Sequence, residues 1–431
     1  MGHLTRGRYR GLQERMDRSI PGIFDSETLY EILRLLFTDE EARLCALMPL
    51  TYFDLDRIAG VWEMSPESAR EALERLAAKG LVHCREADGQ TLYLLAPPVL
   101  GFFEFSLMRT DGKFDRKQLS ELYHRYINVE EGFAQTYASV DPPVSRVFVQ
   151  EDALADLNSE VLPYERARAG IDDASCITTG TCFCRHKMEH MGMACDNPQD
   201  VCLTFNDVAK HLAAQGIARE ISKEEAHDIL DLCVQHGLVQ IGDNRADELI
   251  VLCNCCGCCC DLLTIYKRFG TTSLISPSNY LATIDEDACT NCGVCVKRCP
   301  VDAIEQKGNR VRVKEDRCLG CGVCTRFCPT DACGLRTRDQ RPYVPANTFE
   351  KVALQSIDRG KIGNFLFDDF RKRHHRVLAG LINALVRLPP VRRLLLSKPV
   401  RSRLFGSLAQ KDRFRISSAA RHPDGKGDGA P

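Results

Sequence analysis

Cysteine is the residue type with the most capacity for chemistry in this sequence. There are 23 cysteines, and all but Cys45 and Cys84 lie between Cys176 and Cys333. The densest stretch, VLCNCCGCCCDLL at residues 251–263, holds six of them in eight positions. The N-terminus is basic but lacks the apolar core of a secretory signal, and in such a long chain clustered cysteines indicate metal ligation more than disulfides.

Two segments repeat one spacing of cysteines, CTNCGVCVKRCP at residues 289–300 and CLGCGVCTRFCP at residues 318–329. In each, three thiols two residues apart lie on a loop opened by a glycine and can reach three corners of a cubane cluster. The fourth cysteine leads the chain away, and the proline after it fixes the turn. Zinc is the alternative for a single C-x2-C pair, but two complete copies with both prolines favour iron–sulfur clusters.

These segments resemble the bacterial dicluster ferredoxins over residues 280–335. The resemblance implies two [4Fe-4S] clusters, and in that family the fourth cysteine of each motif binds the cluster of the other motif. The implied ligands of cluster one are Cys289, Cys292, Cys295 and Cys328, and those of cluster two are Cys318, Cys321, Cys324 and Cys299. The chain between the motifs predicts a hairpin that turns at residues 307–309. Cys333 matches no ligand of the family and is expected to be buried packing.

A second cysteine system lies upstream and contains ten candidate metal ligands. Four fall within residues 182–202 and six within residues 253–260, which we call the cysteine strip: Cys182, Cys184, Cys195, Cys202, Cys253, Cys255, Cys256, Cys258, Cys259 and Cys260. Six thiols so close in sequence cannot all bind one cluster, so the two sets are expected to form a composite site.

The strip follows an apolar run that predicts a strand. If the strand continues, side chains alternate, with Cys253, Cys255 and Cys259 on one face and Cys256, Cys258 and Cys260 on the other. Gly257 would let the chain bend. The segment HKMEH at residues 186–190 matches a zinc-protease pattern, but its place among cysteines favours a chance match or a helix that covers a cluster.

The combination of both cysteine sets with the downstream module resembles a group of prokaryotic iron–sulfur proteins that carry a dicluster ferredoxin at the C-terminal side. This resemblance implies an architecture and leaves the central group open. The alternatives are one or two further iron–sulfur clusters, zinc, or a noncubane cluster of the heterodisulfide-reductase type, whose CCG motif is similar to residues 255–257.

Residues 38–98 predict three helices followed by a hairpin. Ser65 is a suitable N-cap with Pro66 at the first helical position, and Asp88–Gly89 is a turn dipeptide between two strands. This order resembles the MarR-type winged-helix modules of transcription regulators. The third helix balances its basic residues with acidic ones, which gives little drive to bind DNA: Arg70, Arg75 and Lys79 against Glu67, Glu71 and Glu74.

The region from residue 359 to residue 417 is strongly basic, with fifteen Lys or Arg against three Asp. Within it Val377, Leu381, Leu385 and Leu388 recur at helical spacing. Such a helix suits a protein-docking surface or peripheral contact with a membrane. It is too short to span a bilayer.

The whole chain of 431 residues has 44% hydrophobic residues and a net charge of −2, as expected for an ordinary globular protein without overall attraction to nucleic acid. The expected location is the cytoplasm. We predict an α+β multidomain fold, with these parts: a basic N-terminal arm and helix (1–37), a winged-helix-like domain (38–98), a connecting region (99–175), a cysteine-rich, mixed helical metal-binding domain (176–270), a dicluster ferredoxin-like domain (280–335), a basic amphipathic helical region (345–417) and a disordered tail (418–431).

These features predict an iron–sulfur electron-transfer protein that exchanges electrons with a redox protein or enzyme partner. The alternative is a redox- or metal-responsive winged-helix regulator, with DNA as its partner. A third reading is a reductase subunit with catalysis at the central cysteines. No dinucleotide fingerprint, P-loop or nucleophile constellation supports independent turnover, so a carrier or redox subunit is favoured over an independent enzyme.

Overall fold

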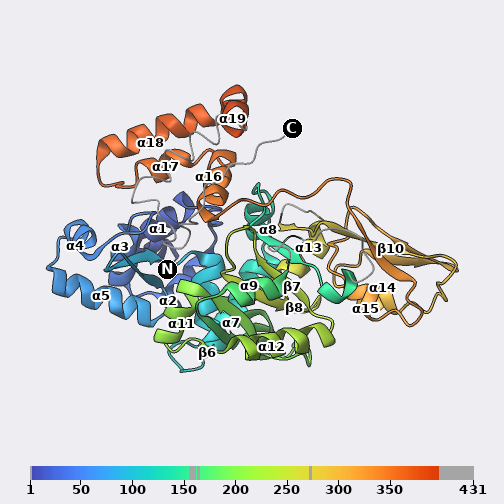
Figure 1. Cartoon of the computed structure of the whole chain (residues 1–431). Helices are drawn as coiled ribbons and strands as arrows, with labels where there is room; N and C mark the ends of the chain where they lie inside the picture. Colours follow the sequence, from blue (N-terminus) through green and yellow to red (C-terminus); the bar gives the residue numbers. More distant parts are fainter. Residues whose placement is uncertain (1, 155–161, 163–165, 271–273, 398–431) are drawn as a thin grey trace.

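The computed structural model describes residues 2–154, 162, 166–270 and 274–397. It is a mixed α/β structure with a central sheet, a helical N-terminal part at one end and the iron–sulfur module at the other (Figure 1). The tail predicted to be disordered, 418–431, and the end of the basic region, 398–417, lie outside the described residues.

The N-terminal part contains five helices and a hairpin: α1 (Gly2–Arg18), α2 (Glu27–Leu36), α3 (Asp39–Ala46), α4 (Leu55–Trp62), α5 (Pro66–Ala78), β1 (Val82–Ala87) and β2 (Gln90–Leu95). Ser65 caps α5 directly before Pro66, as the sequence predicts. Asp88 and Gly89 both have positive φ, which a two-residue hairpin turn of this kind requires. The order helix, helix, helix, hairpin is the one expected for residues 38–98, and membership of the winged-helix class stays a prediction.

Residues 98–140 connect this part to the sheet through short helical elements. These are the irregular segment Pro98–Phe102, α6 (Phe103–Met108), α7 (Arg116–His124), the π-helical segment Arg125–Val129 that continues α7, and α8 (Glu131–Ala138). Phe103 and Met108 are buried and reach the wall of the cysteine site described below.

The central sheet has seven strands in the order β6-β4-β5-β8-β7-β3-β9, and every neighbouring pair except β3 with β9 is antiparallel. The strands are β3 (Ser145–Phe148), β4 (Ile177–Thr181), β5 (Asp200–Phe205), β6 (Arg219–Ile221), β7 (Val239–Asp243), β8 (Val251–Cys255) and β9 (Ile275–Ser276). The cysteine-rich part is therefore built on a sheet that also includes a strand of the predicted connecting region. The sequence of β3, Ser-Arg-Val-Phe, has no alternation of polar and apolar residues, and all four residues are buried. Periodicity therefore does not reveal this strand.

Five helices lie between the strands of this sheet in the chain: α9 (Ala167–Asp173), α10 (Phe183–His190), α11 (Asn206–Ala214), α12 (Lys223–Gln235) and α13 (Asp261–Phe269). Ile171 of α9 and Leu230 of α12 pack in one apolar cluster with Leu203 of β5 and Leu252 of β8. Because side chains alternate along a strand, the cysteines that adjoin these leucines, Cys202 and Cys253, face the opposite side of the sheet.

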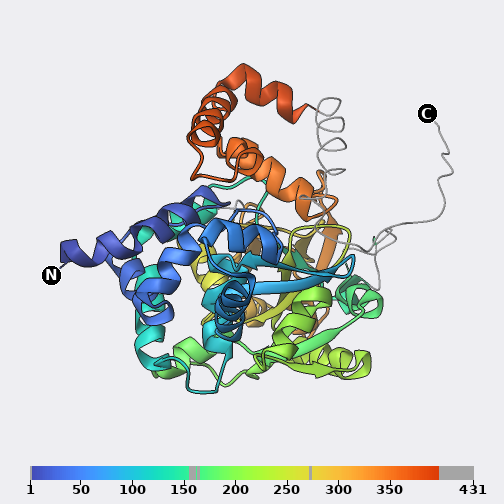
Figure 2. The same cartoon turned by 90° about the vertical axis from the view of Figure 1, so that its left-hand side faces the viewer.

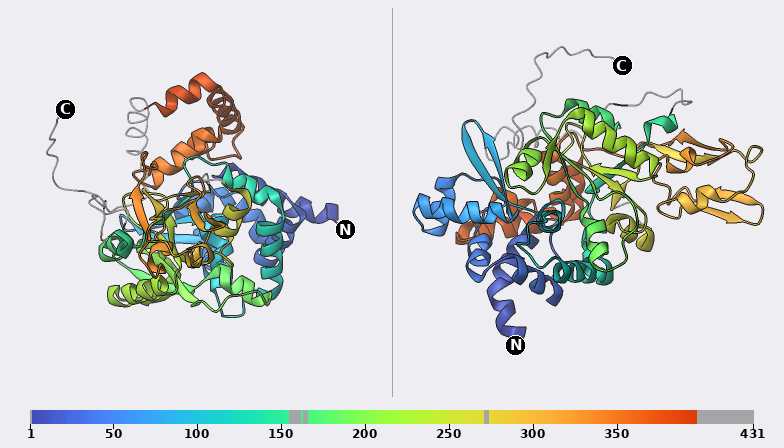
Figure 3. Two further views of the ribbon diagram at one scale, coloured as in Figure 1. Left: turned by 90° about the vertical axis from the view of Figure 1, so that its right-hand side faces the viewer. Right: turned by 90° about the horizontal axis from the view of Figure 1, so that it is seen from below.

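The iron–sulfur module lies beyond the sheet and consists of β10 (Tyr280–Ile284), α14 (Val294–Arg298), β11 (Ile304–Lys307), β12 (Arg310–Val313), α15 (Val323–Arg326) and β13 (Cys333–Thr337). Strands β11 and β12 form the predicted hairpin, with Lys307 paired to Arg310. Gly293 and Gly322 begin the two short helices with positive φ. Figure 3 shows this module projecting at the end opposite the β1–β2 hairpin.

Four helices close the described chain: α16 (Thr348–Asp358), α17 (Ile362–Leu366), α18 (Arg373–Val386) and α19 (Pro389–Leu396). They arch over the N-terminal part (Figure 2). Asp368, which is buried, accepts hydrogen bonds from Arg57 at 3.0 Å and Thr51 at 3.0 Å and so ties this region to α4. Among the described residues, no helix is long and apolar enough to cross a bilayer.

Candidate metal centres

The cysteines of the two ferredoxin motifs are brought together across the motifs. Cys328, the last cysteine of the second motif, lines one small cavity with Cys289, Cys292 and Cys295 of the first. Cys299, the last cysteine of the first motif, is close enough to the second motif that, in addition to burial, charge on its thiol raises the pKa of Cys321 and Cys324. In addition to burial, charge on Cys318 in turn raises the pKa of Cys299. These are the two sets that the resemblance implies.

Burial keeps several of these thiols neutral in the absence of a bound group. It raises the pKa of Cys321 to about 12 and also raises the pKa of Cys299, whose sulfur accepts a hydrogen bond from the amide of Ala303 at 3.2 Å. Cysteine binds metals as the thiolate, so loading this site must release protons. The donor set fits thiolate-bound clusters: all eight cysteines except Cys292 are buried or half-buried, glycines with positive φ begin the two short helices, and a backbone amide donates to a sulfur.

A fifth thiol lies beside the cluster-one cysteines. Cys333 is buried, as predicted, and it lines the same cavity and contacts Cys295 and Cys328. In the first motif the residue at the matching position, four residues after the proline, is Ile304. Comparing the two halves of the module in this way would have identified Cys333 as an unusual neighbour of the site.

Seven of the ten central cysteines line one cavity of about 110 Å³, and one of them, Cys256, also belongs to a second group described below. We call this cavity the six-thiol chamber after the other six: Cys182, Cys184, Cys202, Cys253, Cys255 and Cys260. The rest of the wall is mainly apolar and includes Phe103, Phe183 and Leu262. A single water needs only about 10–15 Å³ of such volume, so the chamber has room for a group larger than one water or one ion.

The backbone around the six-thiol chamber favours negative charge. Cys182 is the N-cap of α10 and Cys260 is the N-cap of α13, and neither helix has a side-chain capping bond at this end. Helix N-termini carry partial positive charge, which stabilises thiolates and other anions. Burial raises the pKa of the Cys182 thiol to about 12, so deprotonation there requires a bound cation or cluster.

A buried arginine is the strongest sign that an anionic group belongs here. Arg185 is 1% exposed, and its Nη1 donates to the carbonyl of Asn254 at 3.0 Å. Its Nε and Nη2 have no hydrogen-bond partner within the described part of the chain. Burial lowers the pKa of this guanidinium, but the negative charge of the nearby Cys182 and Cys256 thiols outweighs burial, so the pKa is raised overall. A fully buried guanidinium with free donors needs a compensating negative charge, which a thiolate-bound metal group supplies.

The chamber also contains a carboxyl group that sequence reasoning missed. Glu104 lines the cavity together with Cys202 and Cys253, and its carboxylate accepts a hydrogen bond from the amide of Gly101 at 3.0 Å. Burial against apolar side chains raises the pKa of Glu104 to about 7. Its neighbour Leu100 has φ of 55°, an uncommon conformation for leucine. Only the fold reveals this residue, because it comes from the connecting region.

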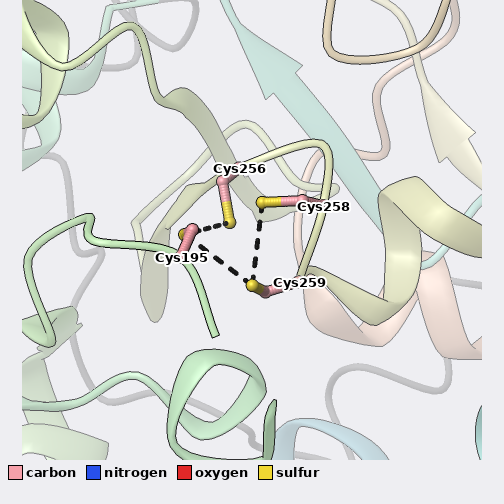
Figure 4. A group of neighbouring side chains, drawn as sticks. All are labelled: Cys195, Cys256, Cys258 and Cys259. Carbon is pink, nitrogen blue, oxygen red and sulfur yellow. Dashed lines mark hydrogen bonds between the residues drawn. The ribbon is translucent and has the colours of Figure 1, made fainter. Parts of the chain in front are cut away.

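Four central cysteines form a second group, which we call the four-thiol site and which borders the chamber at Cys256: Cys195, Cys256, Cys258 and Cys259 (Figure 4). Their sulfurs all lie within 4.8 Å of one another. The Sγ atom of Cys195 is 3.7 Å from those of Cys256 and Cys259, and the sulfurs of Cys258 and Cys259 are also 3.7 Å apart. Cys258 is exposed, whereas Cys256 and Cys259 are buried.

The strip does not alternate as the sequence predicts. Strand β8 ends at Cys255, a turn follows, and α13 begins at Asp261. Cys259 therefore joins the group of Cys256 and Cys258, and Cys260 joins that of Cys253 and Cys255. The expected pairing of Cys259 with Cys253, and of Cys260 with Cys256, was wrong because period-two alternation holds only while the chain stays extended.

A glycine is required at position 257 because the backbone of the cysteine strip lies against the backbone of the first ferredoxin motif there. A Cβ atom at this position would lie 2.5 Å from the carbonyl oxygen and 3.0 Å from the Cα of Pro300. Pro300 directly follows Cys299. The turn that holds the four-thiol site thus rests on the backbone beside a cluster-two cysteine.

Other contacts join the same faces. The amide of Gln150 donates to the carbonyl of Cys321 at 3.0 Å, and its side chain donates to the carbonyl of Leu238, the residue directly before β7. The loop of the second motif therefore packs on the central sheet, which brings the cluster-two cysteines next to the strip.

The H-x-x-E-H segment on α10 does not form the site of a zinc protease. His186 and His190 have their Nε2 atoms 3.1 Å apart, and His186 Nδ1 lies 2.6 Å from the carbonyl oxygen of Leu107. Glu189 instead accepts a hydrogen bond from Gln199. Among the described residues, no third ligand joins the two histidines within the 4.8 Å that defines the four-thiol site. The helix does carry Cys182, Cys184 and Arg185 to the chamber.

Comparison with known proteins supports one part of this description. Residues 282–335 match the family model of a 4Fe-4S dicluster domain. Comparisons with curated proteins and with solved structures found no match for the chain. The chain thus contains an iron–sulfur module of the dicluster type, and its cysteine-rich centre is consistent with a role in electron transfer.

Proposed function

We propose that this protein transfers electrons between the two [4Fe-4S] clusters of its ferredoxin module and a third iron–sulfur cluster in the six-thiol chamber, on behalf of a redox partner protein. When bound, such clusters supply one-electron chemistry. The observation that carries the proposal is Arg185, whose free buried donors lie among chamber thiols and call for an anionic group there.

The contacts at the junction support a connected role for the two parts. Gly257 of the strip lies against Pro300 of the first motif, and Gln150, which follows β3, is bonded to Cys321 of the second, so both motifs contact the part that carries the chamber. Cys292 of the cluster-one set is exposed. This arrangement suits entry or exit of electrons at the outer, cluster-one end and exchange with the chamber at the inner, cluster-two end.

The N-terminal part supports a packing or docking role better than DNA binding. Lys79, the C-cap of α5, is paired with Glu41 at 2.6 Å, which leaves the exposed face of this helix with fewer free cations. On β1, His83 packs against His211 of α11, with ring centroids 4.9 Å apart. A hairpin held on the central part is not free to act as a wing on DNA. Tight, salt-sensitive DNA binding in a gel-shift assay would favour the regulator instead.

The test is the metal content of the full chain purified without oxygen. We expect about twelve irons with matching sulfide, against about eight if only the ferredoxin clusters are present. A Cys253→Ser, Cys260→Ser double variant should lose about four irons and one electron paramagnetic resonance signal while the ferredoxin signals remain. Cys176→Ser is the matched control, because Cys176 is half-buried and does not line the chamber. Eight irons in the wild type would refute the third cluster.

A further inference from the structure

Four of the ten central cysteines have closely spaced sulfurs and form the four-thiol site, and one of them, Cys256, also borders the chamber. Four ligands at about 2.3 Å around one tetrahedral ion place their sulfurs about 3.8 Å apart. In the four-thiol site, three of the sulfur–sulfur distances are 3.7 Å. A cubane spreads its four cysteine sulfurs further, because each binds a different iron.

The ferredoxin cysteines provide an internal comparison. Within the described ranges, Cys195, Cys256, Cys258 and Cys259 are the only group of three or more metal-ligand side chains whose donor atoms all lie within 4.8 Å of one another. Neither ferredoxin set meets that limit, although residues 282–335 match a cluster-binding family. Sulfur spacing thus distinguishes cluster ligands from the four-thiol site inside one molecule.

Two side chains beside the four-thiol site can donate hydrogen bonds to its sulfurs. The side-chain amide of Asn197 donates to the sulfur of Cys195 at 3.2 Å. Arg185 Nη1 lies 3.8 Å from the sulfur of Cys256. A divalent ion with four thiolates has a formal charge of −2, and hydrogen-bond donors and a buried cation beside the sulfurs reduce the cost of holding it. All four positions are protein ligands, which is the arrangement of structural sites.

We propose that Cys195, Cys256, Cys258 and Cys259 bind one Zn²⁺ in a closed tetrahedral site that is separate from every iron–sulfur cluster of the chain. Binding deprotonates the four thiols and involves no change of oxidation state. The ion joins the loop after α10 to the turn after β8. It thereby fixes α10, which carries Cys182 and Cys184, relative to the strip that carries the other chamber cysteines, and it holds the turn against Pro300.

The experiment uses the full chain purified without oxygen, with zinc and iron measured together. We expect one zinc per chain, and X-ray absorption at the zinc edge should show four sulfurs at about 2.3 Å. A Cys258→Ser, Cys259→Ser double variant should lose the zinc and keep its iron. The control, Cys176→Ser, should keep both metals.

Three outcomes would overturn the proposal. The wild type could contain no zinc, the double variant could lose about four irons, or the site could hold a single iron with the absorption of a ferric thiolate. The wild-type measurements need no variant, so they decide the matter even if the double variant does not fold. Zinc content also separates this inference from the chamber cluster, because the chamber variants act on iron and the four-thiol variants on zinc.

Discussion

Gly257→Ala would place a methyl group where the cysteine strip meets the ferredoxin module. The added Cβ would lie 2.5 Å from the carbonyl oxygen of Pro300 and 3.0 Å from its Cα. Both atoms belong to the backbone, so they cannot turn aside as a flexible side chain would. Forcing an extra carbon into such a contact costs about 1–3 kcal/mol. This energy favours separation of the two surfaces by roughly 5- to 150-fold.

Hydrogen exchange at Gln150 measures that separation. Its amide is bonded across the junction to the carbonyl of Cys321, so it exchanges when the module moves away. In mass spectrometry of the peptide that covers residues 146–154, we expect this amide to exchange roughly 5- to 150-fold faster in Gly257→Ala. Gly380→Ala is the control, since a Cβ there meets no atom within 4 Å. Equal exchange in Gly257→Ala and wild type would show that the close approach is not a constraint.

Three further changes test other parts of the structure. Burial lowers the pKa of His83 to about 4 and that of His211 to about 3. Because only the unfolded chain binds protons at these histidines between pH 6.5 and 4, stability should be fully present above pH 6.5 and fall as the pH drops, by about 1.4 kcal/mol per pH unit for each histidine. Fluorescence of the single tryptophan, Trp62, during urea unfolding should report this slope, and an unchanged slope in a His83→Gln, His211→Gln variant would contradict it. Cys333→Ile, which copies Ile304, should leave the ferredoxin irons unchanged, whereas loss of a cluster would make Cys333 a ligand. Leu381, 57% exposed on α18, should support binding to vesicles of anionic phospholipid, and Leu381→Glu should weaken it; a wild type that does not sediment with vesicles excludes the membrane contact.

The ferredoxin module was predictable from the sequence because its ligands are set by local spacing. Three cysteines of each motif lie within seven residues, a glycine begins the short helix that carries the third, and a proline follows the fourth cysteine. The hairpin at residues 307–309 follows from an equally local pattern, whereas the burial of Cys333 was expected because this cysteine matches no ligand of the family.

The division of the central cysteines could not be predicted in the same way. It depends on β8 ending at Cys255, a boundary that no residue marks: the turn-favouring Asn254 lies inside the strand, and Gly257 lies two residues beyond its end. The chamber wall needs Phe103 and Glu104, which lie about 150 residues before the strip in the sequence. The sequence predicts that Gly257 lets the chain bend, whereas the structure shows that a side chain at this position would collide with the backbone of Pro300. Only the packed structure reveals that contact.

Two peptide bonds of the strip have an unusual property. One joins Cys255 of the six-thiol chamber to Cys256 of the four-thiol site, and the other joins Cys259 of the four-thiol site to Cys260 of the chamber. Consecutive Cα atoms are 3.8 Å apart across a planar, rigid unit, so sulfurs on neighbouring residues cannot be more than roughly 9 Å apart. That is about one Debye length at physiological ionic strength, and the intervening protein screens even less. Removing a divalent ion from one side therefore changes the electrostatic potential felt on the other, so the reduction potential of a chamber cluster should report whether its neighbour is filled.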